Sequence, residues 1–154
     1  MEVHVRWLCP HKPPRIPYLA TPGAAGYDLA ACLDRDVVLP PGGRTLIPTG
    51  LAVALPGPDV ALLVLPRSGT ALRLGLSLAN AAGVIDGDYR GEIKLIAVNL
   101  DPREPVTIRD GDRIAQMLFV PVLRPELRLV EELPETERGE RGFGSTGVGT
   151  ETNF

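Results

Sequence analysis

The stretch GVIDGDYRGE, residues 83–92, places two acids and a tyrosine among residues that form turns. Apolar residues of β type flank the turn, in GVI before it and in IKLIAVN after it. This order of strand, turn and strand is typical of antiparallel β structure. Asp86 and Asp88 are therefore either solubilising charges at a hairpin tip or carboxylates of a reactive site, and the rest of the chain must discriminate between the two.

The same alternation of apolar segments and turns continues along most of the chain. Breakers recur about every 8 to 12 residues, and 17 glycines and 16 prolines disfavour long helices. The pattern predicts an all-β single domain, either a sandwich or a barrel. The expected strand segments are Val3–Trp7, Val37–Leu39, Arg44–Ile47, Leu51–Leu55, Val60–Leu65, Ile93–Asn99, Val106–Ile108, Ile114–Val120 and Leu127–Val130.

Two parts of the chain depart from this pattern. The window SGTALRLG, Ser68–Gly75, predicts a helix of at most two turns, with Ser68 as its cap and Gly75 at its end. After about Glu131 the sequence becomes polar, charged and rich in glycine. Such a segment buries too little apolar surface to offset the entropy of ordering. We expect residues 1–130 to form the domain and residues 131–154 to form a mobile tail.

Composition excludes several classes of function. The 154 residues carry a net charge of −3 with no basic face that could hold a nucleic-acid backbone, and no apolar run approaches the roughly 20 residues of a membrane span. Cys9 and Cys32 form no CxxC motif and no metal-ligand spacing with His4 and His11, so we expect two reduced thiols. The N-terminus has no signal-peptide pattern. We expect a cytoplasmic protein without a nucleic-acid or membrane partner.

Five short stretches stand out from the strands and turns, and each alone has a plain structural interpretation as a turn, helix cap, hairpin or linker. They are AGYDLAA (25–31), PRSGTA (66–71), NAAGVIDGDYRGE (80–92), GDRIAQ (111–116) and RGFGSTG (141–147). Together and in this order, they resemble the five motifs of the trimeric dUTP diphosphatases (dUTPases), over residues 22 to 147. The resemblance implies a distorted β-barrel or jelly roll with one short helix and a flexible C-terminal tail.

The residue types in these stretches suit a nucleoside triphosphate, which brings about four negative charges and needs donors for its phosphates. Arg67 and Arg141 can each place two N–H groups on phosphate oxygens. Ser68 adds a hydroxyl, the Ser68–Gly69 amides open the expected helix, and Gln116 is a neutral donor. In the tail, glycines let the backbone approach phosphate closely, and hydroxyls stand beside them. The tail residues concerned are Gly142, Gly144, Ser145, Thr146 and Gly147.

The resemblance implies hydrolysis of dUTP to dUMP and pyrophosphate, which keeps uracil out of DNA and supplies dUMP for thymidylate synthesis. By this resemblance Asp86 activates the water that attacks the α-phosphorus, and Asp28 supports it near the sugar. Tyr89 lies against the deoxyribose and excludes a 2′-hydroxyl, while Phe143 stacks on uracil when the tail closes. A β-hairpin around residues 80–92 presents uracil with the Asn80 side chain and with backbone groups, which we assign to Gly83, Val84 and Ile85. Magnesium is held by substrate phosphates and water, with no protein ligand.

The resemblance also implies a homotrimer with shared sites, in which the first, second and fourth motifs come from one chain, the third from a neighbour and the tail from the third chain. One alternative is a dCTP deaminase, but Ile96 occupies the position of the deaminating Glu; we expect Glu92 and Lys94 to point in other directions. A second alternative is a non-catalytic nucleotide-binding β-barrel module. Gly87 departs from the family, where Ser or a larger residue is common, and we expect it to loosen the turn.

Overall fold

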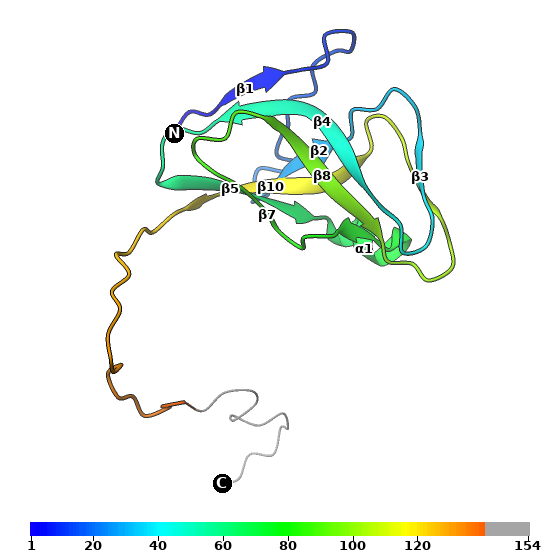
Figure 1. Cartoon of the computed structure of the whole chain (residues 1–154). Helices are drawn as coiled ribbons and strands as arrows, with labels where there is room; N and C mark the ends of the chain where they lie inside the picture. The colour runs from blue at the N-terminus through cyan, green and yellow to red at the C-terminus, as the bar shows by residue number, and fades with distance from the viewer. Residues whose placement is uncertain (141–154) are drawn as a thin grey trace. The chain divides into compact units, whose positions relative to one another are not determined.

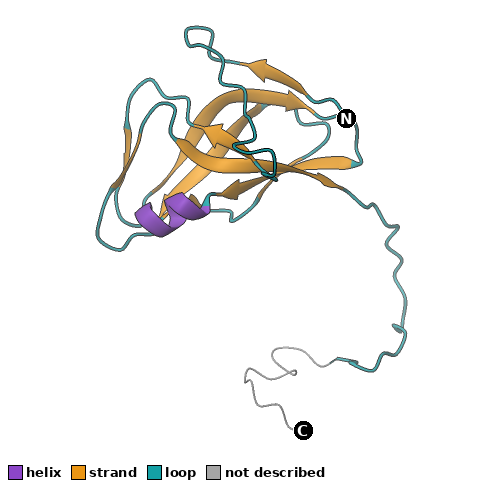
Figure 2. Cartoon of the chain, turned by 180° about the vertical axis from the view of Figure 1, so that it is seen from behind, coloured by secondary structure: helices purple, strands orange, loops and turns teal. Residues whose placement is uncertain are grey.

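A computed structural model describes residues 1–140 of the chain, which form ten β-strands and one short α-helix. The elements are β1 (His4–Trp7), β2 (Tyr27–Ala30), β3 (Val37–Leu39), β4 (Arg44–Ala54), β5 (Val60–Pro66), α1 (Ser68–Leu74), β6 (Leu76–Leu78), β7 (Gly83–Ile85), β8 (Glu92–Asn99), β9 (Val106–Ile108) and β10 (Arg113–Pro121). The expected all-β fold with one short helix is confirmed (Figure 2).

The strands form two four-stranded antiparallel sheets and one small two-stranded sheet (Figure 1). The first sheet has the order β1-β4-β8-β6, and the second has the order β2-β10-β5-β7. Strands β3 and β9 pair with each other. Sequence neighbours therefore often belong to different sheets, so the chain crosses repeatedly between the two layers.

The core lies between the two larger sheets, because one face of each contributes buried side chains to a single cluster. In β8, residues Ile93, Leu95 and Ala97 are almost fully buried, and the residues between them are more exposed. This period of two places one row of side chains against the core. Burial of each Leu or Ile side chain contributes about 1.5–3 kcal/mol, which makes this pattern the main determinant of the fold.

An irregularity in β4 joins two segments that the sequence analysis expects to be separate. The pairing of β4 with β8 shifts between Pro48 and Ala52, and Gly50 has a φ of 69°. The buried hydroxyl of Thr49 donates to the Ile93 carbonyl at 2.6 Å and accepts the Leu51 N–H at 3.3 Å, so this polar group at the bulge has partners. Residues 44–54 are therefore one bent strand.

Short strands escaped the sequence analysis, and one expected strand is absent. Strands β2 and β6 span only four and three residues, too few to show an alternation, whereas the GVI segment was expected and is β7. The expected segment Leu127–Val130 carries no strand, and its side chains are exposed. The compact unit of the chain is Met1–Leu123, and the second unit is Arg124–Phe154. No helix of residues 1–140 is long and apolar enough to cross a membrane.

The loop of residues 86–91 is not a hairpin tip, contrary to expectation. Strand β7 pairs with β5 in the second sheet, and β8 pairs with β4 and β6 in the first. No ladder within residues 1–140 joins β7 to β8 or to β6. The loop is a crossover between the layers (Figure 1), because each flanking strand finds its partner elsewhere in the chain.

Helix α1 ends as predicted but begins differently. Gly75 takes the left-handed conformation, with a φ of 63°, and its N–H bonds to the Ala71 and Thr70 carbonyls. The expected cap at Ser68 is wrong, because Arg67 is the N-cap and makes no capping bond with its side chain. Ser68 is the first helical residue, and its hydroxyl makes no hydrogen bond within residues 1–140.

Candidate active site

Asp28 on β2 lies between two arginines that come from distant parts of the chain. Its Oδ1 is 3.0 Å from Nε of Arg67, and its Oδ2 is 3.0 Å from a terminal nitrogen of Arg113. The Arg67 guanidinium also donates to the Arg113 carbonyl at 2.8 Å. The Asp28 side chain is only 11% exposed, so both ion pairs are partly shielded from water. The cluster carries one negative and two positive charges and therefore attracts an anion.

The strand order of the second sheet explains why Asp28, Arg67 and Arg113 lie close together. Strand β10 lies between β2 and β5, so a residue at the end of β5 and a residue on β2 meet across it. The pairing of β10 with β2 shifts between Arg113 and Ala115, which leaves one extra residue on β10. Such a bulge redirects the neighbouring side chains. Here Ile114 enters the core, while the Arg113 side chain reaches Asp28.

Gln116 also belongs to this cluster, but its amide is already engaged. Its Nε2 donates to the Pro66 carbonyl at 3.1 Å, next to Arg67. Gly26 provides the room for this arrangement, because a Cβ there would lie 2.8 Å from Oε1 of Gln116. The expected neutral donor thus holds the end of β5, and it retains one further N–H for a ligand.

The third motif lies elsewhere on the second sheet. Ile85 pairs with Leu62 of β5, whereas Arg67 follows five residues further along the same strand direction. Five strand residues span roughly 17 Å. Asp86 follows Ile85 away from Arg67 and therefore cannot reach the Asp28 cluster of its own chain. Within residues 1–140, the Asp86 carboxylate makes no hydrogen bond and no ion pair.

Strand β7 is an edge strand, which suits recognition of a planar polar ring. Among residues 1–140 it pairs only with β5, so alternate N–H and C=O groups of Gly83–Ile85 have no ladder partner there. The turn before it contains Ala81 with a φ of 57°, an uncommon conformation for a residue other than glycine. Its neighbour Asn80 has its amide nitrogen 3.5 Å from where a Cβ on Gly83 would lie. Ala81 could not be expected from the sequence, since alanine carries no signal for this conformation.

Gly87 is required by a close contact rather than loosening the turn. A Cβ at this position would lie 2.6 Å from the Gly57 carbonyl oxygen. The loop before β5 therefore packs directly on the residue that follows Asp86. This contact explains why a larger residue is absent here.

Arg113 is a candidate site residue that was not expected from the sequence, although GDRIAQ contains it. The same guanidinium nitrogen that donates to Asp28 lies 3.5 Å from the Tyr18 hydroxyl. A hollow of about 520 Å³ adjoins this group and is lined by residues 14–18, Asp28, Ala30, Gly111 and Arg113. A cation within the fourth motif was the signal that could have found it.

A second network holds the wall of this hollow. Asp110 accepts two bonds from Arg15, at 2.8 and 2.5 Å, and one from the Leu33 N–H at 2.9 Å. Lys12 adds an ion pair at 3.2 Å. The Arg15 guanidinium holds the pKa of the Asp110 carboxyl well below its usual range. The network ties the N-terminal segment to the turn that precedes Arg113.

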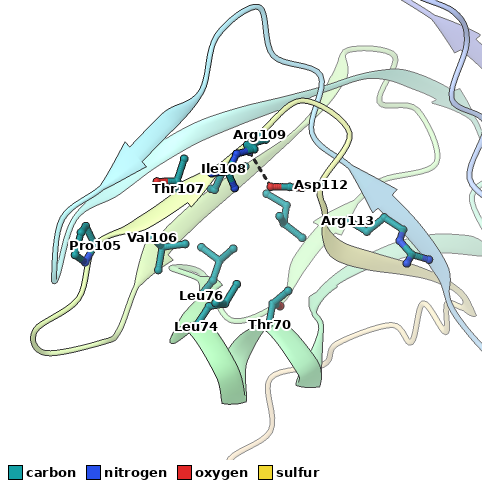
Figure 3. Close-up of a pocket in the computed structure, with 11 residues that line it drawn as sticks. Thr70, Leu74, Leu76, Pro105, Val106, Thr107, Ile108, Arg109, Asp112 and Arg113 are labelled. Atoms are coloured by element: carbon teal, nitrogen blue, oxygen red, sulfur yellow. Dashed lines mark hydrogen bonds between the residues drawn. The ribbon is translucent and has the colours of Figure 1, made fainter.

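A separate apolar hollow of about 440 Å³ lies between α1 and β9 (Figure 3). Leu74 and Leu76 face Val106 across it, and the Arg109 N–H donates to Asp112 at 2.8 Å at its upper end. Arg113 stands at its edge with the guanidinium turned away. Neither Asp28 nor Asp86 lines this hollow, so it is not where the polar groups gather.

The cysteines take no part in these groups, and both are free thiols. Burial, followed by a hydrogen bond with Cys9, raises the pKa of the Cys32 thiol to about 12. No group of three or more His, Cys, Asp or Glu side chains within residues 1–140 could hold a metal ion. The part of the chain that the structure describes thus provides no ready-made metal centre.

The orientation of side chains on β8 bears on the deaminase alternative. Ile96 is on the outer face of β8, but Glu92 and Lys94 share that face, contrary to our expectation. Residues two apart on a strand point the same way, so Glu92, Lys94 and Ile96 face one side of the sheet. Glu92 is nevertheless occupied, because its carboxylate accepts the Gly50 N–H at 2.9 Å.

The expected site residues of the tail lie outside the described residues. They are Arg141, Gly142, Phe143, Gly144, Ser145, Thr146 and Gly147.

The chain is similar to known proteins over most of its length. A family model described as dUTPase matches residues 12–147. A deoxyuridine 5'-triphosphate nucleotidohydrolase of Desulfitobacterium hafniense is 52% identical over 148 residues, which cover 96% of this chain and 97% of that protein. Two solved phage structures are also similar. A dUTPase mutant of Staphylococcus bacteriophage 80alpha with dUpNHpp has 30% identity and a TM-score of 0.82, over 96% of this chain and 99% of that one.

The second is a dUTPase mutant from phage phi11 of S. aureus, described with a structural Mg(II) ion. It has 27% identity and a TM-score of 0.76, over 88% of this chain and 100% of that one. The matched residues include the Asp28 cluster and the 83–92 stretch.

Proposed function

This chain belongs to the dUTPase family, and we propose that it hydrolyses dUTP to dUMP and pyrophosphate. The oxygen of a water molecule forms a bond to the α-phosphorus while the bond to the α,β-bridging oxygen breaks. Pyrophosphate leaves with the electron pair, and the water proton passes to a carboxylate. The reaction removes a precursor of uracil in DNA and supplies dUMP for thymidylate synthesis, and we place it in the cytoplasm.

The observation that carries this proposal is the meeting of Asp28, Arg67 and Arg113. Asp28 fixes both guanidiniums, and Arg67 retains N–H groups beyond those bound to Asp28 and to the Arg113 carbonyl. Donors held in place before the substrate arrives stabilise phosphate charge without reorganisation. We assign phosphate binding to this cluster, together with Ser68, Gly69 and Gln116, and a supporting role to Asp28.

We assign the proton-accepting role to Asp86. Its carboxylate makes no competing bond within residues 1–140 and follows directly on the edge strand β7. In this assignment the unpaired backbone groups of Gly83–Ile85 and the Asn80 amide recognise uracil, and Tyr89 lies against the deoxyribose. A general base must come within hydrogen-bond reach of its water, so Asp86 must approach a nucleotide bound at an Asp28 cluster.

One chain cannot satisfy that requirement, which supports a shared site. The Asp28 cluster and Asp86 lie at opposite ends of the β5–β7 ladder. We therefore propose a homotrimer in which Asp86 of one subunit faces the Asp28 cluster of another. The exposed side chains of Leu123, Leu127 and Leu129 provide apolar surface for such an assembly. We propose that residues 131–154 close over this site, with Arg141, Gly144, Ser145 and Thr146 on phosphate and Phe143 on uracil.

The donor set of the chain suits a magnesium ion that arrives with the substrate rather than one held by protein ligands. Both oxygens of Asp28 are engaged by guanidiniums, and residues 1–140 gather no other ligand group. Phosphate oxygens and water are the hard ligands that Mg²⁺ prefers. Bound there, the ion offsets phosphate charge.

A pyrophosphate-release assay tests the proposal. The purified chain should release pyrophosphate from dUTP in the presence of Mg²⁺ and far less from dTTP, dCTP or UTP, and EDTA should suppress the release. Asp86→Asn should abolish turnover while its matched control, Asp88→Asn, should retain it. Formation of uracil nucleotides from dCTP, or tight dUTP binding without turnover, would contradict the proposed activity.

A further inference from the structure

The hydroxyl end of Tyr89 rests on the backbone of Gly91. A Cβ at Gly91 would lie 2.6 Å from Cζ of Tyr89, far inside an ordinary contact. The Tyr89 hydroxyl passes over this residue and donates to the Glu92 carbonyl at 3.0 Å. Tyr89 as a whole is 43% exposed, so part of the residue presents a surface to solvent while its hydroxyl end is held.

The group that holds this hydroxyl is part of the first sheet. Glu92 is the first residue of β8 and pairs with Ala52 of β4. Its carboxylate accepts the Gly50 N–H at 2.9 Å, next to the bulge of β4. The Glu92 carbonyl is therefore fixed to the sheet, and the ring that depends on it has a defined height above Gly91.

The other end of the same loop is braced by Arg90. Its guanidinium donates to the Gly87 carbonyl at 2.9 Å and to the Tyr89 carbonyl at 2.8 Å. The Tyr89 N–H donates to the Asp86 carbonyl at 3.2 Å. These bonds fix the backbone of Tyr89 relative to Asp86, so the remaining freedom of Tyr89 is the direction of its ring.

We propose that Gly91 is a specificity-determining position: by leaving space beneath the hydroxyl end of Tyr89, it sets the ring at the height that excludes a 2′-hydroxyl. This inference rests on the proposed function, which places the deoxyribose against Tyr89. Gly91 acts through Tyr89 and touches neither the reacting phosphorus nor the attacking water.

Alanine at this position isolates the effect of the ring. Gly91 does not have a positive φ, so its backbone conformation tolerates a side chain. The three heavy atoms nearest to the added methyl group, outside the adjoining residues, all belong to Tyr89. The ring must therefore leave its place and lose the bond to Glu92, while Asp86 keeps its own position.

The test compares Gly91→Ala with Gly57→Ala, where a Cβ meets nothing within 4 Å. For each variant, kcat/KM is measured for dUTP and for UTP, and dissociation constants are measured for the α,β-imido analogues of both nucleotides. We expect Gly91→Ala to lower the preference for the deoxynucleotide roughly tenfold or more, the scale of one lost contact in a binding pocket. The turnover number for dUTP should change much less, and Gly57→Ala should match the wild type.

Tyr89→Phe provides a second variant that keeps the fold. It removes the bond to Glu92 but leaves the ring above Gly91, so its preference should fall between those of the wild type and Gly91→Ala. An unchanged preference in Gly91→Ala, with kcat/KM lowered equally for both nucleotides, would show a merely structural role and overturn the inference. If the wild type bound both analogues but released no pyrophosphate, the proposed function would fail, and the ratio of dissociation constants would still decide the role of Gly91.

Discussion

Gly26→Ala should disable Gln116 without touching it directly. The new Cβ would lie 2.8 Å from Oε1 of Gln116 and 3.3 Å from Cδ1 of Leu118. An ordinary contact begins near 3.4 Å, so the amide oxygen must retreat by about 0.6 Å. The Gln116 amide is already bonded to the Pro66 carbonyl at 3.1 Å. It therefore cannot retreat and keep that bond, and must adopt another rotamer.

The cost of this change follows from the bond that is lost. A neutral hydrogen bond contributes about 0.5–1.5 kcal/mol to stability, so the free energy of unfolding should fall by about 1 kcal/mol. The effect on turnover should be larger, because the carbonyl beside Arg67 loses its support and a ligand loses a neutral donor. A misplacement of about 1 Å in a site can cost 10²-fold, and we expect kcat/KM for dUTP to fall about 10- to 100-fold.

A double-mutant cycle with Gln116→Ala measures whether the effect passes through Gln116. Four proteins are compared by dUTP turnover and by urea unfolding: the wild type, the two single variants and the double variant. If the reasoning is right, Gly26→Ala costs much less once Gln116 is alanine, because the 2.8 Å clash is gone and the milder contact with Leu118 at 3.3 Å remains. Gly23→Ala is the control, because a Cβ there meets nothing within 4 Å. Equal costs of Gly26→Ala in both backgrounds, or an equal loss in Gly23→Ala, would refute the argument.

Three further predictions concern charge, acid stability and a turn. Asp28→Asn should raise KM and lower kcat together, because Arg67 and Arg113 lose the carboxylate that orients them. If steady-state assays gave a lower KM with unchanged kcat, the only effect of the substitution would be the added positive charge of the site, and the orienting role would be refuted. Asp110→Asn should lower the unfolding free energy at neutral pH by about 1–2 kcal/mol, towards the lower value because the Asp110 side chain is 35% exposed. Since the folded-state pKa of Asp110 is depressed, this stabilisation is present above about pH 4 and is lost as the pH falls further. In urea unfolding at pH 7 and pH 3, the unfolding free energy should therefore fall less on acidification in Asp110→Asn than in the wild type. The control Asp36→Asn should show the same fall as the wild type. Gly75→Ala should lower the stability in thermal unfolding more than Gly42→Ala does. Both positions have a positive φ, which costs about 1–2 kcal/mol for alanine, but a Cβ at Gly75 would also lie 2.6 Å from the Asp101 nitrogen. Equal losses of stability in the two variants would refute the clash.

Local patterns explain which parts of the fold the sequence predicted. The alternation in Ile93–Asn99 shows directly which side chains face the core, because a strand has a period of two. Gly75 predicted the end of α1 for an equally local reason, since glycine adopts a positive φ without steric cost. The prediction of Ser68 as the N-cap was wrong, because serine favours that position in general, while here Arg67 occupies it.

The candidate site was predictable in its residue types but not in its arrangement. Asp28, Arg67 and Gln116 each belong to a short motif, so a list of candidates could be drawn up from composition and order. Arg113 stood in one of those motifs, but only the bulge of β10 directs it to Asp28. Gly87 looked like a loose turn, because its neighbour Gly57 is thirty residues away in the chain.

The sequence by itself determined that this chain is a β domain with acidic and basic groups suited to a triphosphate, because strand period, turn residues and side-chain chemistry are local properties. Only the tertiary structure decided that residues 86–91 cross between two sheets, and that the Asp28 cluster and Asp86 stand at opposite ends of one ladder. Strand partners and their register depend on contacts between segments far apart in the chain. Local propensity carries no information about such distances, although they decide whether one chain can complete a site.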